Sequence, residues 1–151
     1  MREFDTLAEM SGHVGEELGT SDWLVVTQPM IDMFADATGD HQWIHVDPER
    51  AAKGPFGATI AHGFLTLSLL PKLAGDAVKI KDQKMGVNYG LNRVRFTSPV
   101  RAGARVRARS TLAGFEPLPN NGAQVTMNVV IELEGSDKPA CVAEAISRRY
   151  A

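Results

Sequence analysis

The chain has 151 residues, of which 44% are hydrophobic and 23% charged, and its formal net charge is −2. This length predicts one domain, residues 1–151, that is large enough to bury a hydrophobic core. The composition excludes a disordered chain. The charge gives no general attraction to nucleic acid or anionic membranes, and no apolar run approaches the roughly 18 residues that a membrane span needs.

The single cysteine, Cys141, cannot form an internal disulfide, and no Cys/His spacing resembles a zinc site. Its apolar neighbours predict core packing rather than a reactive thiol. The first residues carry acids and lead into no apolar run of signal-peptide length. There is also no glycine-rich phosphate loop, nucleophile elbow or HExxH motif. We therefore expect a cytoplasmic protein that needs no metal and no nucleotide cofactor.

The N-terminal part predicts two short elements. Phe4, Leu7 and Met10 follow one another at helical spacing, which favours a short helix up to about Met10. Residues 23–26, Trp-Leu-Val-Val, are rich in strand formers and predict the first substantial strand.

A helix is predicted to begin after Thr27. Thr27 is a suitable N-cap, and Pro29 falls in the first turn, where its missing N–H costs least. Gly39 is well placed to end this helix in a left-handed conformation. Asp40 then emerges at the helix C-terminus, and the chain is expected to continue as a loop through His45.

A second cap signal follows at Asp47, which precedes a proline. It predicts a short helix over residues 49–53, closed by Gly54. Residues 62–74, HGFLTLSLLPKLA, then predict a helix with hardly any polar face. A helix of this kind is buried on most sides, which in a small domain requires a sheet around it.

The second half of the chain supplies that sheet. Turn residues separate four strand-like runs, at residues 84–96, 106–115, 124–133 and 140–150. Connections this short imply antiparallel pairing, because parallel strands need a long crossover. The predicted fold is α+β, with a curved antiparallel sheet wrapped around a central apolar helix.

Asp40 and His45 are the first candidates for chemistry, because a carboxylate and an imidazole on one short loop can move a proton to or from water. On one interpretation they share a water molecule. On the other, Asp40 accepts backbone N–H bonds in a turn and His45 fills space. Spacing alone favours the second interpretation.

His62 and Gly63 stand at the start of the apolar helix, where N–H groups are free and the dipole is positive. Glycine allows a ligand oxygen to come close, so the Gly63 N–H could stabilise an oxyanion. Equally, Gly63 could only relieve crowding against the sheet. For His62, packing or capping is favoured over catalysis.

Asn88, Tyr89 and Gly90 lie in the first long strand and could line a site, since a glycine within a strand marks a bulge or a close approach. Arginines alternate at positions 105, 107 and 109 and therefore share one face. That face could attract phosphates, but a solvated outer surface explains it better.

Taken together, three blocks resemble the MaoC-like family of (R)-specific enoyl-CoA hydratases, which have the hotdog fold. They span about residues 34–103 and read Phe34…Thr38-Gly39-Asp40…Ile44-His45…Asp47…Ala51, then Phe56-Gly57…Ile60-Ala61-His62-Gly63, then Asn88-Tyr89-Gly90…Val94-Arg95-Phe96…Pro99-Val100…Gly103.

The resemblance implies addition of water to a trans-2-enoyl-CoA to give an (R)-3-hydroxyacyl-CoA, reversibly, in fatty-acid or lipid metabolism and without a metal or redox cofactor. It implies that Asp40 and His45 hold and activate the water and that the Gly63 N–H is the oxyanion donor. It also implies a homodimer of single hotdog domains, with the acyl-CoA bound near the interface.

One departure concerns Gln42 and Trp43, which stand where the family usually has Asn-Pro. Gln42 keeps polar capacity, whereas Trp43 is much larger than proline and bears on the acyl-chain preference. We place Gln42, Trp43, His62, Asn88, Tyr89 and Gly90 among the expected substrate-binding residues. Two alternatives stay open: a hotdog acyl-CoA thioesterase, and a non-catalytic subunit of a heterodimeric dehydratase.

Overall fold

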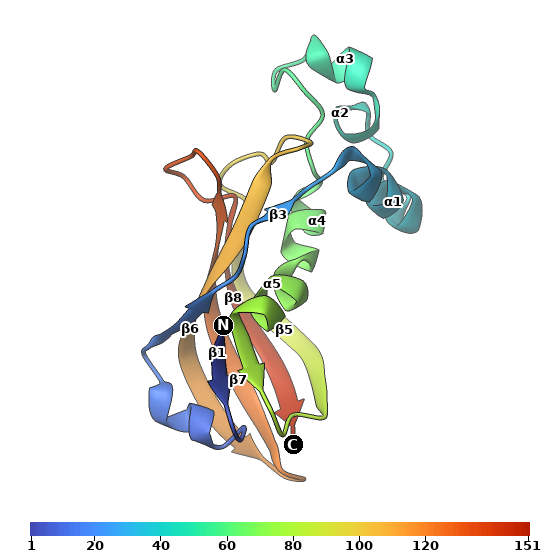
Figure 1. The fold of residues 1–151 in the computed structure, drawn as a ribbon. Coiled ribbons are helices and arrows are strands. Elements are labelled where there is room, and N and C mark those ends of the chain that lie inside the picture. Colours follow the sequence, from blue (N-terminus) through green and yellow to red (C-terminus); the bar gives the residue numbers. More distant parts are fainter.

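A computed structural model describes all residues, 1–151, and its helices and strands form an α+β fold (Figure 1). In chain order the elements are β1 (Arg2–Phe4), the 3-10 helix η1 (Glu9–His13), β2 (Glu17–Thr20), β3 (Leu24–Val25), α1 (Gln28–Thr38), α2 (Trp43–Val46), α3 (Pro48–Ala52), α4 (Gly63–Ser68), α5 (Leu70–Ala77), β4 (Val78–Ile80), β5 (Met85–Arg95), β6 (Arg105–Leu118), β7 (Gly122–Leu133) and β8 (Cys141–Tyr150).

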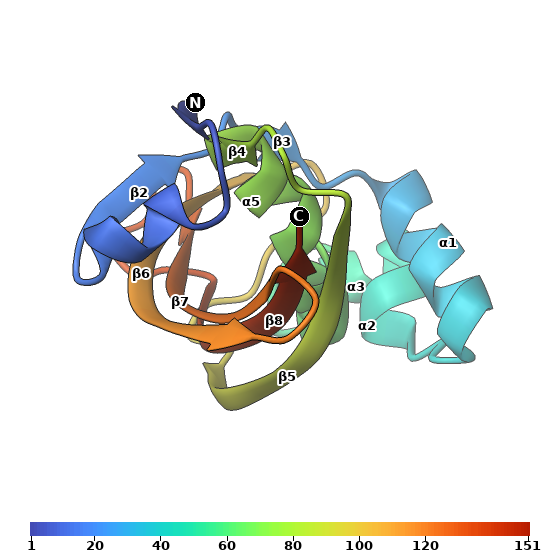
Figure 2. The same cartoon turned by 90° about the horizontal axis from the view of Figure 1, so that it is seen from below.

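The main sheet confirms the prediction of four long antiparallel strands. Its order is β2-β6-β7-β8-β5, and β3 pairs with the first residues of β6, Arg105 and Val106. Seen from below in Figure 2, these strands form an arc around α5. Alternation along β7 turns Val125, Met127, Val129 and Ile131 toward the concave, buried side. The curved sheet wrapped around a central helix is therefore observed as expected.

The central helix is not continuous, which corrects the prediction of one helix over residues 62–74. It divides into α4 and α5 at Leu69. Pro71 explains the break, because proline has no N–H and its ring clashes with the carbonyl four residues earlier. Burial is also uneven. Leu65, Leu70 and Leu73 lie in the core, whereas Phe64 is 67% exposed on α4.

The N-terminal predictions were wrong in detail. The first residues form β1, which pairs in parallel with β4, and η1 follows. Phe4, Leu7 and Met10 are all buried, so the apolar pattern marked core residues but not their conformation. Of the strand predicted at residues 23–26, only β3 forms, and β2 was not predicted.

Helices α1–α3 project beyond the end of the sheet, on the same side as the start of α4 (Figure 1). The predicted caps are confirmed: Thr27 Oγ1 accepts from the Met30 N–H, and Gly39 has a φ of 81°. Asp47 caps α3 through the Arg50 N–H, and α3 ends at Ala52 with Lys53 as its C-cap, close to the predicted end. No helix in the chain is both long and apolar enough to cross a membrane.

Candidate active site

Asp40 follows the C-terminus of α1 directly, as the sequence predicted. Because Gly39 adopts the left-handed conformation, the chain turns sharply there and Asp40 leaves the helix axis. Asp40 is exposed, and one of its carboxylate oxygens accepts a long hydrogen bond, 3.4 Å, from the Gln42 N–H. The carboxylate is otherwise free of protein donors, which leaves its second oxygen for a ligand.

His45 lies on α2, a short helix in the stretch expected to be a loop. The turn forms because the backbone N–H of His45 bonds to the carbonyl of Gln42 at 2.9 Å. The imidazole is buried, and its Nδ1 lies 2.7 Å from the carbonyl oxygen of Ile60. A carbonyl can only accept, so Nδ1 carries the proton and, in the neutral ring, Nε2 is the free acceptor. In the neutral ring, Nε2 of His45 is thus the nitrogen that can accept a proton.

His62 packs directly on His45. The two rings stack with their centroids 3.9 Å apart and an interplanar angle of 25°. His62 Nε2 donates to the backbone carbonyl of Asp40 at 3.0 Å, while its buried Nδ1 has no hydrogen-bond partner. His62 therefore ties the Asp40 backbone to the His45 ring. It packs as expected, but its side chain makes no capping bond to α4.

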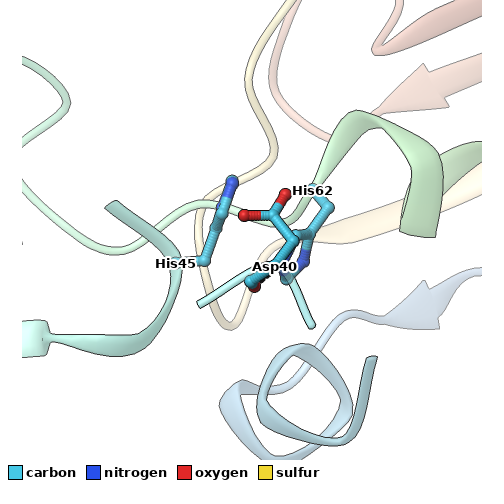
Figure 3. A group of neighbouring side chains, drawn as sticks. All are labelled: Asp40, His45 and His62. Atoms are coloured by element: carbon cyan, nitrogen blue, oxygen red, sulfur yellow. Dashed lines mark hydrogen bonds between the residues drawn. The ribbon is translucent and has the colours of Figure 1, made fainter. Parts of the chain in front are cut away.

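Asp40 and His45 come from one short stretch and His62 from the start of α4, and the three side chains meet in one cluster, shown in Figure 3. A carboxylate oxygen of Asp40 and one ring nitrogen from each histidine lie within 4.8 Å of one another. This spacing suits a water molecule that bonds to two of the groups. It suits a metal ion poorly, because the in-plane lone pairs of two stacked imidazoles do not converge on one point about 2.0–2.2 Å away.

Gly63 begins α4 and lies against the ring of Phe96. A β-carbon added at Gly63 would come within 2.7 Å of that ring, so no larger residue fits without a shift. The crowding interpretation of this glycine therefore has a structural basis. The oxyanion interpretation stays a prediction, which the position of Gly63 in the first helical turn, where N–H groups lack helical partners, still permits.

Gln42 and Trp43 are not brought into the cluster by their side chains. Gln42 is exposed and contacts Asp40 through its backbone N–H. The Trp43 ring packs under the guanidinium of Arg50, 4.3 Å away, and leaves no room for a β-carbon at Gly54. In this structure Trp43 holds α2 against α3.

The three candidates on β5 separate between two faces. Asn88 and Gly90 line a cavity of about 710 Å³ between α4–α5 and the concave side of β5 and β8. Tyr89 points to the other side, where Arg148 lies 4.0 Å from its ring centroid. On α4 the lining of the cavity includes Leu67, one helical turn after Gly63. Asp40, His45 and His62 do not line the cavity.

The sequence predicted no supporting role for three residues around His45. Ile60 supplies the carbonyl that fixes the His45 ring, and Gln28 donates to the His45 carbonyl at 2.8 Å. Thr59 in turn donates to the Gln28 side chain. A backbone carbonyl carries no residue-specific signal. Gln28 lies in the first turn of α1, where the sequence marked only Thr27 and Pro29.

Solved structures define the fold class. An R-hydratase from Pseudomonas aeruginosa superposes with a TM-score of 0.70 at 25% identity, covering 89% of this chain and 79% of that one. An (R)-hydratase from A. caviae gives a TM-score of 0.67 at 25% identity over 87% of this chain and 95% of that one. The fold is the hotdog fold, and the enzyme class of these neighbours is hydratase.

The family follows from the sequence matches. The family profile described as "MaoC like domain" matches residues 9–133. The 3-hydroxyacyl-thioester dehydratase Z of Mycobacterium tuberculosis is 57% identical over the full length of both chains. Nodulation protein N of Rhizobium leguminosarum bv. viciae is 51% identical over 94% of this chain and 89% of its own. The chain belongs to the MaoC-like family and is a hydro-lyase.

Proposed function

We propose that this enzyme adds water reversibly to trans-2-enoyl-CoA, giving the (R)-3-hydroxyacyl-CoA. The observation that carries the proposal is the Asp40–His45 cluster. It pairs an open carboxylate with a buried imidazole whose Nδ1–H is fixed by a carbonyl, so that Nε2 is available. The names of the tuberculosis dehydratase and of the two R-hydratases point to the same reaction class.

In the hydration direction, the oxygen of water bonds to the β-carbon of the enoyl thioester. One proton of that water passes to the Asp40–His45 pair, and a proton is delivered to the α-carbon as the enolate collapses. Atoms and charge therefore balance without a cofactor. The two groups act as a coupled pair, so the proton is assigned to the pair and not to one residue. The Gly63 N–H is our candidate donor to the enolate oxygen.

The test is the loss of enoyl-thioester absorbance when crotonyl-CoA or a longer enoyl-CoA is added. Asp40→Asn and His45→Gln should each lower kcat by at least about 100-fold, in the range of general acid–base catalysis, with unchanged circular dichroism. Chiral analysis of the product checks the (R) configuration. Full activity in either variant would remove the assignment.

Two other outcomes decide against hydration. Release of free thiol, detected with a thiol-reactive dye, would indicate a thioesterase. Absence of any turnover by the pure protein, restored by a second and different chain, would indicate a non-catalytic subunit. The intact Asp40 and His45 pair speaks against that role.

We further propose that the chain works as a single-domain homodimer in the cytoplasm. The support for the dimer is β5, an edge strand that pairs only with β8. Its exposed side chains include Met85, Val87, Tyr89 and Leu91. A long apolar edge invites pairing with another strand. A two-fold axis would make β5 pair antiparallel with its own copy, which extends one sheet through both protomers.

A further inference from the structure

The cavity between α5 and the concave face of β8 is not purely apolar. Its hydrophobic part is formed by side chains such as Leu70, Met127 and Val129, which suit an acyl chain. Its end near Gly86 is different, because Arg149, Ser147 and Gln83 all line it there. Arg149 and Ser147 belong to the face of β8 that turns toward the helix, since they lie opposite Ala123 and Val125, both buried.

Arg149 is a partly buried cation at the wall of this cavity, without an acidic partner. Burial lowers the pKa of its guanidinium. No carboxylate lies within ion-pair distance of it. Of the other 15 arginines and lysines, seven do have one: Arg2, Lys72, Lys79, Lys81, Arg105, Arg107 and Arg109. A buried charge is costly unless it is paired. An anionic partner in the cavity would therefore stabilise Arg149.

The guanidinium is also held in place. Its Nε donates to Ser147 Oγ at 3.2 Å, and one terminal nitrogen donates to Gln83 Oε1 at 3.5 Å. A guanidinium has five N–H donors, so three have no protein acceptor. Fixed, unused donors at the wall of a cavity favour recognition of a planar acceptor such as a carboxylate.

A second polar group lies at the other end of the same cavity. Ser110 is 0% exposed, and its hydroxyl has no hydrogen-bond partner. Ser110 pairs with Val129 on β7, and Val129 pairs with Ala143 on β8. Ala143 lies six residues before Arg149 on the same strand. At about 3.3 Å per residue, the two polar groups are about 20 Å apart along the strand. Polar groups with unused hydrogen-bonding capacity thus lie at both ends of the cavity.

We propose that this cavity takes the acyl part of a thioester whose chain carries an oxygen acceptor, foremost a terminal carboxylate, and that Arg149 binds this group. The proposal rests on the proposed hydration of enoyl thioesters and names the substrate class within it. Arg149 is here a specificity residue and takes no part in the chemistry at Asp40 and His45.

The experiment uses trans-2-enoyl-CoA substrates of increasing length, each with either a methyl or a carboxylate at the far end. For the wild-type protein, we expect one length at which the carboxylate form has at least about a 10-fold higher kcat/KM, as a charge-assisted hydrogen bond supplies. Arg149→Leu should abolish this preference and retain turnover of the methyl form, and Arg149→Lys should restore part of it. The matched control is Arg109→Leu, an exposed arginine on β6, which should behave as wild type.

Two results of this substrate series overturn the proposal: no carboxylate preference at any length, or a carboxylate preference that survives in Arg149→Leu. The carrier offers another anion, the phosphates of CoA. Pantetheine thioesters have no phosphate, so they show whether Arg149 binds the acyl carboxylate or a phosphate of the carrier. If Arg149→Leu impairs methyl-ended CoA substrates but not their pantetheine counterparts, Arg149 binds the carrier and the proposal fails.

A binding measurement separates this proposal from the reaction itself. Calorimetry with a saturated pantetheine thioester that ends in a carboxylate requires no turnover. Binding that is at least about 10-fold weaker for Arg149→Leu supports the site even if no enoyl thioester is hydrated. Equal binding by both proteins counts against the site even if hydration is fast. Matching thermal unfolding curves show that the variant is folded.

Discussion

The rings of His45 and His62 stack 3.9 Å apart, and His62 also donates to the backbone of Asp40. From these two contacts we expect His62 to position the other two groups of the cluster. His62→Phe keeps a flat ring but leaves the carbonyl of Asp40, an exposed residue, without its donor, a loss of about 0.5–1.5 kcal/mol. We expect kcat to fall by roughly 3- to 10-fold with little change in KM.

His62→Gln is the matched variant, because its amide N–H can still reach the Asp40 carbonyl. It should recover part of kcat in steady-state assays on one enoyl-CoA. Equal activity of His62→Phe and wild type would show that the stack has no positioning role.

Gly63 and Phe96 form a second tight contact. Gly63→Ala places a β-carbon 2.7 Å from the Phe96 ring. Because Phe96 is 45% exposed and its ring can shift, we expect a cost at the lower end of the roughly 1–3 kcal/mol of core overpacking. We expect a lower midpoint of thermal unfolding and lower activity. The double variant Gly63→Ala/Phe96→Leu should regain both, because alanine keeps the backbone N–H that we assign to the oxyanion.

The outcome of the double variant distinguishes two uses of this glycine. Recovery of stability and activity together fits a spatial requirement with the N–H preserved. Recovery of stability alone would mean that a ligand atom needs the space of the missing side chain.

Cys141 is fully buried in β8, and desolvation raises the pKa of its thiol to about 11. An unfolded cysteine has a pKa of about 8.5. At pH 8 the thiolate is therefore scarcer in the folded protein by roughly two orders of magnitude. Because the folded state retains the proton, this group makes stability fall as pH rises from about 8.5 toward 11.

The measurement is the reaction with a chromogenic disulfide reagent at pH 8, with and without denaturant. We expect very slow labelling of the native protein and rapid labelling of the unfolded one. Cys141→Ser provides the blank. Fast stoichiometric labelling of the native protein would contradict the burial of the thiol.

The exposed edge of β5 predicts that two chains form a dimer. A dimer has twice the chain mass of 16.4 kDa. Tyr89→Lys places a charge in the middle of the edge and beside Arg148, which disfavours strand pairing. Light scattering at low micromolar concentration should give a dimer for wild type and a monomer for the variant. Val14→Lys, exposed but near β6 at the other side of the sheet, is the control and should stay dimeric.

The sequence by itself determined the elements whose signals are local. Thr27 and Gly39 mark the ends of α1 because a cap and a left-handed turn depend on single residues. The four long strands follow from alternation and turn residues, and their short connections require antiparallel pairing. Asp40 and His45 could be named as a pair because both lie on one short segment.

Only the tertiary structure decided the rest, because those features join segments far apart in the chain. The Ile60 carbonyl selects the His45 tautomer, and His62 reaches the Asp40 backbone across 22 residues. The apolar pattern predicted one continuous central helix and a helix near the N-terminus. The structure instead divides the central helix at Leu69 and pairs β1 in parallel with β4. The cavity and its unpaired Arg149 exist only where β8 faces α5. No local signal marks a charge as buried, since burial depends on what packs against it.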